Sequence, residues 1–97
     1  MATYLIFSSW TQQGIQSAKE APARLDAIKQ AAKAGGGEIK ASYLVTGEYD
    51  FVTVVEAPND ETLARLIIAT GMQGNLRTKT VRAFTEDEYR KIIASLP

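Results

Sequence analysis

Hydrophobic and polar residues along much of this chain follow the two-residue period of a β-strand. Residues 3–9 (TYLIFSS) and 51–56 (FVTVVE) are short and rich in β-branched and aromatic side chains, so they predict strands. Residues 38–45 alternate apolar with polar side chains, which predicts a half-buried strand near a sheet edge. Residues 75–84 predict a fourth strand that is polar for its class. The chain therefore supplies the strands of one small sheet.

Three other segments have the features of helices. The first begins at Pro22, ends at glycines 35–37, and turns an apolar stripe inward while Arg24 and two lysines face water. The second occupies residues 59–71, with an Asn or Asp cap and acids in its first turn. The third is short, covers residues 85–96, and opens with a Thr–Glu capping box.

The resulting order is β-α-β-β-α-β-α in a single domain, residues 1–97. Two βαβ halves with right-handed crossovers give an antiparallel sheet of strand order 4-1-3-2 with its helices on one face. The expected fold class is therefore α+β, a ferredoxin-like βαββαβ unit with an extra C-terminal helix.

The first and third predicted strands are apolar at both alternations, so both faces of the sheet need cover. Exposing about four such side chains forgoes roughly 1.5–3 kcal/mol each. The C-terminal helix is one candidate cover, but one short helix is narrow against a four-stranded sheet. We therefore favour a second copy of the chain and expect a homodimer or a higher homo-oligomer. On this hypothesis, Phe51→Asp dissolves the dimer or unfolds the chain.

Composition removes several classes of function. Eleven basic residues balance eleven acidic ones, so no long-range field favours nucleic acid or an anionic membrane, and we expect neither as a partner. The chain has no cysteine and no histidine, which removes thiolates, the commonest metal ligand and the usual general base. We therefore expect no metal and no cofactor.

Targeting signals are also missing from the sequence. The first seven residues lack the basic and apolar regions of a signal peptide. No apolar run approaches the roughly 20 residues that cross a bilayer. The expected location is the cytoplasm.

The turn at residues 47–50 (GEYD) resembles the GYD-domain family of small bacterial and archaeal proteins. Further stretches similar to that family follow its order at residues 10–14, 57–60, 74–80 and 82–85. The likeness covers essentially the whole chain, and several ordered matches are more specific than one turn.

The resemblance implies a dimeric α/β-barrel fold and little about activity. One departure is that Ala21 precedes Pro22 where a Ser or Thr helix cap is expected, which affects only the start of that helix.

In this topology three loops, at residues 10–14, 47–50 and 72–75, emerge at one end of the sheet, where binding residues are often found. The candidate ligand-binding residues are Trp10, Gln13, Tyr49, Asp50, Asn75 and Arg77. A structural interpretation competes with each role: Tyr49 and Asp50 form a turn, Trp10 packs, and Arg77 is one of the charges that protect an edge strand. No catalytic residue is assigned.

Two functions follow as hypotheses. The first is a homo-oligomeric module that binds a small organic ligand in a cleft at the sheet end, or that serves in assembly. The alternative is a cofactor-independent enzyme of the dimeric α/β-barrel kind, similar to small monooxygenases or isomerases, and it rests on fold analogy.

Overall fold

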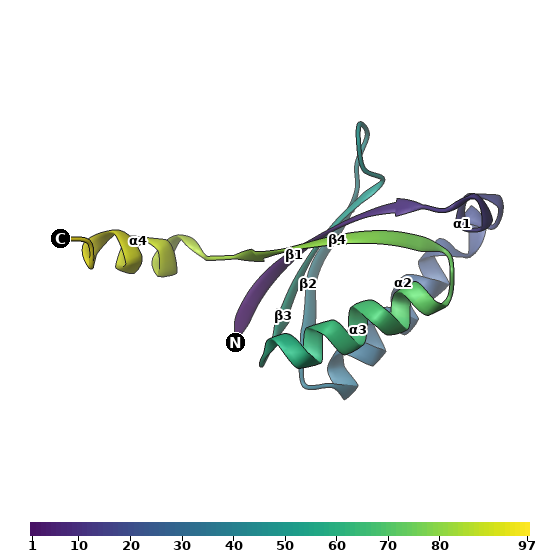
Figure 1. Cartoon of the computed structure of the whole chain (residues 1–97). Helices are drawn as coiled ribbons and strands as arrows, with labels where there is room; N and C mark the ends of the chain where they lie inside the picture. The colour runs from purple at the N-terminus through teal and green to yellow at the C-terminus, as the bar shows by residue number, and fades with distance from the viewer.

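A computed structural model describes all 97 residues, and it shows one four-stranded antiparallel sheet with two long helices on one side (Figure 1). The strands are β1 (Ala2–Trp10), β2 (Glu38–Leu44), β3 (Phe51–Ala57) and β4 (Leu76–Ala83). The helices are α1 (Gln12–Gln16), α2 (Ala21–Ala34), α3 (Asp60–Met72) and α4 (Glu86–Ala94), with a short 3-10 helix, η1 (Ala18–Glu20), before α2. The sheet order β2-β3-β1-β4 confirms the predicted ferredoxin-like topology.

Helix ends follow the predicted chemistry with two differences. The Asn59 side chain accepts a hydrogen bond from the Thr62 backbone N–H at 2.8 Å and caps α3. Thr85 and Glu88 form the predicted capping box of α4. Helix α2 has no side-chain cap, because η1 leads directly into it. Gly71 lies inside α3 and does not end it.

The core lies between the sheet and the two long helices, and it is small. Its buried apolar cluster comprises Tyr4, Ile6, Val55, Ala57 and Leu63. Only eight of the 97 residues are buried. A single copy of the chain therefore leaves most of its apolar side chains partly in contact with solvent.

The other side of the sheet, here called the open face, carries no helix. Strand register pairs Leu5 with Val54 and Phe7 with Val52, all on this face. On the flanking strands, Tyr43 is 60% exposed and Val81 is 41% exposed. The prediction of a sheet that is apolar on both faces is thus matched by the strand register.

Phe51 lies on the helix side, because it pairs with the buried Ser8 and contacts Trp10 with ring centroids 4.9 Å apart. Phe51→Asp would therefore disturb the core before it disturbed the open face. Val52 and Val54 are the residues that test the open face.

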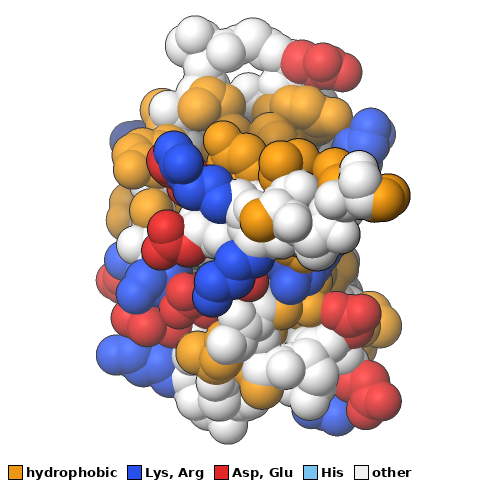
Figure 2. All heavy atoms as spheres, turned by 90° about the vertical axis from the view of Figure 1, so that its left-hand side faces the viewer, with side chains coloured by type: hydrophobic (Ala, Val, Ile, Leu, Met, Phe, Trp, Pro, Cys, Tyr) orange, Lys and Arg blue, Asp and Glu red, His pale blue; other side chains and the backbone are white.

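Helix α4 does not cover the open face. It projects from the end of β4 as an arm, away from the rest of the molecule (Figure 1). The radius of gyration is accordingly 14.6 Å, against roughly 12.5 Å for a compact domain of this length. Viewed from the side on which α4 projects, hydrophobic side chains form a band above the arm (Figure 2). No helix combines the length and the apolar character that crossing a membrane requires.

Candidate functional site

The three predicted loops meet at one end of the sheet through hydrogen bonds. The Trp10 backbone N–H donates to the Asp50 carboxylate at 2.9 Å. The Thr11 backbone N–H donates to the Asn75 carbonyl at 3.0 Å, and the Thr11 hydroxyl donates to the Gly74 carbonyl at 2.6 Å. The ends of β1, β3 and α3 are thereby fixed relative to one another.

Each named residue of the GYD turn has a structural role. Gly47 has φ of 119°, a conformation that residues with a Cβ rarely adopt. The Tyr49 ring packs on Phe7 with ring centroids 5.1 Å apart. The Asp50 backbone N–H donates to the Ser8 carbonyl at 2.9 Å, so both its backbone and its carboxylate bind the end of β1. These contacts match the structural interpretation of the turn.

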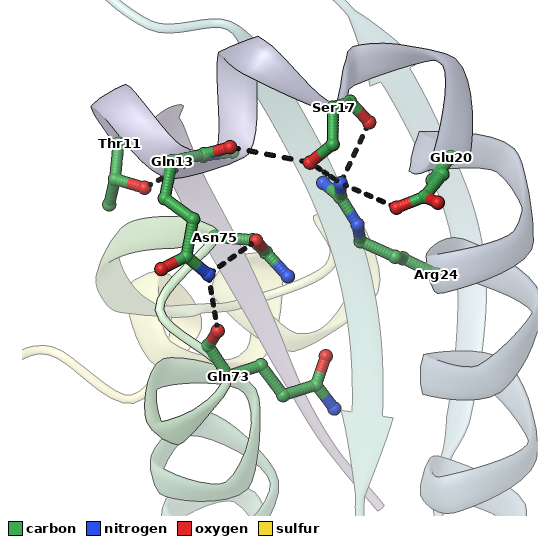
Figure 3. Close-up of polar contacts among 8 residues, drawn as sticks. Thr11, Gln13, Ser17, Glu20, Arg24, Gln73 and Asn75 are labelled. Atoms are coloured by element: carbon green, nitrogen blue, oxygen red, sulfur yellow. Dashed lines mark hydrogen bonds and ion pairs between the residues drawn. The ribbon is translucent and has the colours of Figure 1, made fainter.

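Helix α1 packs directly against the loop between α3 and β4. Gln13 donates from Nε2 to the Gln73 carbonyl at 3.0 Å and to the Asn75 side-chain oxygen at 3.1 Å (Figure 3). A Cβ added at the buried Gly14 would lie 2.1 Å from the Asn75 carbonyl oxygen. Only glycine therefore allows this close approach of α1 to the loop.

A cavity of about 250 Å³ lies between the helix side of the sheet and helices α2 and α3. Eighteen residues line it, and eleven of them are hydrophobic, including Trp10, Leu25, Ile28, Phe51 and Leu66. Protein interiors are normally close-packed, so an apolar space of this size is a candidate ligand site.

Polar groups in the cavity wall are mostly hydroxyls. Ser42 and Thr53 are hydrogen-bonded to each other at 3.1 Å, and Thr70 donates to the Leu66 carbonyl at 2.9 Å. Arg24 is the one charged residue in the lining. The wall thus combines an apolar surface, several hydroxyls and a single positive charge.

Arg24 was predicted to face water, and this prediction was wrong. Its side chain is only 16% exposed and its Nη2 donates to the Ser17 carbonyl at 2.7 Å and to the Ser17 hydroxyl (Figure 3). The missed signal is spacing, because Ala21, Arg24, Leu25 and Ile28 follow the i, i+3, i+4, i+7 pattern of one helix face.

The six predicted ligand residues do not surround one space. Trp10 alone lines the cavity, while Gln13, Asp50 and Asn75 hold the loops together. The other two, Tyr49 and Arg77, lie toward the open face, as the Phe7 contact of the first and the Ser9 pairing of the second show.

One further polar cluster lies at the opposite end of the sheet. The Tyr4 hydroxyl donates to the Asp60 carboxylate, and the Arg82 guanidinium lies 5.6 Å from the centre of the Tyr4 ring. The hydrogen bond to Asp60, with burial adding to it, raises the pKa of Tyr4 above its usual value. No group of three or more carboxylates is placed to hold a metal ion.

Comparison with known proteins adds a family and a relative. The family model described as "GYD domain" matches residues 4–93. A protein of Thermus thermophilus is 33% identical over 84 residues, which is 86% of this chain and 88% of that protein. It is named "Glutamine synthetase and cystathionine beta-lyase binding protein".

Solved structures share the fold at low sequence identity. The feast or famine regulatory protein of M. tuberculosis, complexed with L-methionine, has a TM-score of 0.67 and 20% identity over 88% of this chain and 51% of its own. This chain thus spans about half the length of that protein. The protein FFRP-DM1 has a TM-score of 0.61 and 23% identity, over 87% of this chain and 100% of its own.

Proposed function

This chain belongs to the GYD domain family, and from that premise we propose that it is a non-catalytic, homo-oligomeric binding module. Two copies pair through the open faces of their sheets, and the cavity on the other side of each sheet binds a small organic ligand. One observation carries the proposal: the sheet is apolar on both sides, and in a single copy one side has no cover while the other contains a cavity.

The size and chemistry of the cavity support ligand binding. Its volume of about 250 Å³ exceeds the roughly 150 Å³ at which an apolar cavity already takes up benzene. It lies on the helix side of the sheet, so pairing through the open face does not cover it. A ligand the size of a substituted six-membered ring fits this space.

The cavity wall favours binding over catalysis. Its lining contains no carboxylate and no tyrosine, so the usual side chains for proton transfer are missing from it. The Asp50 carboxylate, one possible base in a chain without histidine or cysteine, already accepts the Trp10 N–H. The cofactor-independent enzyme is therefore the weaker hypothesis.

The charges around the open face support pairing with a second copy. Glu38 and Glu56 lie at one corner, where Lys40 is 3.7 and 4.0 Å from them, and Arg77 and Lys79 lie at the diagonally opposite corner. A twofold axis between two facing sheets, perpendicular to the line joining these corners, places each acidic corner over the partner's basic corner. The face is thus complementary to itself.

A second candidate function is assembly with another protein. The name of the Thermus relative describes binding to two enzymes. The arm of this chain also exposes Tyr89, Ile92, Ile93 and Leu96, a set that fits a protein contact. A small-ligand site and a protein contact use different surfaces and can coexist.

A cavity-filling variant tests the proposal. The fluorescence of Trp10, the one tryptophan of the chain, reports directly on the cavity that it lines. We expect cyclohexanol to change this fluorescence and to raise the melting temperature of the wild type. Thr70→Leu fills the cavity and should abolish both effects, whereas Ala64→Leu, exposed on the same helix, should retain them. A wild type that responds to none of cyclohexanol, cyclohexanecarboxamide and cyclohexanecarboxylate contradicts ligand binding.

A further inference from the structure

The cavity is electrically asymmetric. Of its eighteen lining residues only Arg24 is charged, and no acidic side chain faces it from any element. The remainder of the wall offers hydroxyls and apolar surface. An anionic group in this space therefore meets one positive charge and no negative one.

The guanidinium of Arg24 is only partly used by the protein. Its Nη2 donates to Ser17 and lies 3.6 Å from the Glu20 carboxylate, while Nε and Nη1 donate no hydrogen bond to another protein group. The Glu20 side chain is 73% exposed, so solvent screens it and it neutralises Arg24 weakly. The donors at Nε and Nη1 are therefore left to give a ligand carboxylate a charge-assisted hydrogen bond.

Figure 3 shows where this guanidinium lies. The Arg24 side chain leaves α2 and extends beneath the α1–η1 segment, so its guanidinium lies under Ser17 at the loop end of the molecule. The cavity is lined at the same end by Trp10, Phe51 and Leu76. A ligand held by Arg24 would therefore place its apolar part against aromatic and aliphatic side chains.

We propose that the cavity ligand is a small organic carboxylate with an apolar body, and that Arg24 binds its carboxylate. This inference rests on the proposed function, because it specifies the ligand class of the same cavity. The volume limits the body to about one substituted ring or a branched chain.

Two isosteric probes separate charge from shape. Cyclohexanecarboxylate and cyclohexanecarboxamide have the same body, and at pH 7 only the first is charged. Titrations followed by Trp10 fluorescence should give the carboxylate an affinity at least tenfold higher than that of the carboxamide in the wild type. This difference reflects a charge-assisted hydrogen bond in a poorly solvated site.

Substitutions of the charged pair test the role of Arg24. Arg24→Gln should weaken carboxylate binding roughly ten- to hundredfold and change carboxamide binding less than about threefold. Glu20→Gln, which leaves Arg24 in place and removes a competing carboxylate, should tighten carboxylate binding about two- to fivefold. Arg90→Gln, on the exposed arm, is the matched control and should change neither affinity. Melting temperatures identify any variant that has lost its fold. If Arg24→Gln is such a variant, the effect of Glu20→Gln on carboxylate binding is the test of the role of Arg24.

The outcomes are distinct. Equal affinities of the two probes in the wild type, or unchanged carboxylate binding in a folded Arg24→Gln variant, overturn the anion inference and leave the binding module standing. Failure of both probes to bind overturns the inference together with the proposed function.

Discussion

The polar residues of the GYD turn illustrate how a motif can be structural. Asp50 is bonded to the end of β1 through both its N–H and its carboxylate, and Tyr49 packs on Phe7. The residue types alone are equally compatible with a catalytic pair. Only the spatial partners, which lie about 40 residues away along the chain for the Trp10 contact, distinguish the two interpretations.

Tyr4 gives the molecule a specific dependence on alkaline pH. The raised pKa of Tyr4 means that the unfolded chain loses its tyrosine proton first, at about pH 10. Below that pH the contribution of Tyr4 to the free energy of unfolding is complete, and it is lost as the pH rises toward the folded-state pKa. We expect urea unfolding to show stability falling above about pH 10, and Tyr4→Phe to weaken this fall. Tyr89→Phe, on the exposed arm, should leave it unchanged, and an identical pH profile for wild type and Tyr4→Phe would contradict the argument.

At the scale of elements, the strands were predictable because alternation and glycine or proline breaks are local properties. Their order followed from the right-handed crossovers of the two βαβ halves. The strand facing of Phe51 was not, because the geometry of the preceding turn decides which alternation meets the helices. The inward position of Arg24 follows the helical period but conflicts with its charge, so hydropathy alone assigns it to water. The cavity depends on how side chains from the sheet, α2 and α3 fill a shared volume, which no single segment encodes.

Helix α1 packs against the loop before β4 so closely that Gly14 has no room for a Cβ. We expect Gly14→Ala to destabilise the fold by roughly 1–3 kcal/mol, because the added Cβ overlaps a backbone oxygen that is itself hydrogen-bonded. Gly71→Ala is the matched control: it lies inside α3 with open space around its Cβ position. That change should stabilise by roughly 0.5–1 kcal/mol. Urea unfolding of both variants gives the comparison, and equal stabilities would count against the close packing of α1.

At the scale of the whole molecule, the apolar side chains of the open face favour association with a second copy. Its four central side chains, Leu5, Phe7, Val52 and Val54, are part-buried in the single chain, so covering them adds a fraction of the roughly 1.5–3 kcal/mol that complete burial of each is worth. Tyr43 and Val81 on the flanking strands are more exposed and add to this gain. The total is a useful share of the 5–15 kcal/mol that typically stabilises a domain.

A glutamate introduced on the open face and one introduced on the helix layer should affect the oligomeric state differently. Val54→Glu introduces a charge at the centre of the proposed interface and should convert the dimer to monomer, because a buried unpaired carboxylate is strongly unfavourable. Ile68→Glu, at a 63% exposed position on α3, should leave the oligomeric state unchanged. Size-exclusion chromatography with light scattering distinguishes these results, and a Val54→Glu protein that remains dimeric would place the interface elsewhere.

The central claim, that a second copy covers the open face, is tested most directly by sedimentation equilibrium of the wild-type protein over a range of micromolar concentrations. We predict a species with at least twice the chain mass of 10.6 kDa. A stable, well-dispersed species of 10.6 kDa across that range would contradict it.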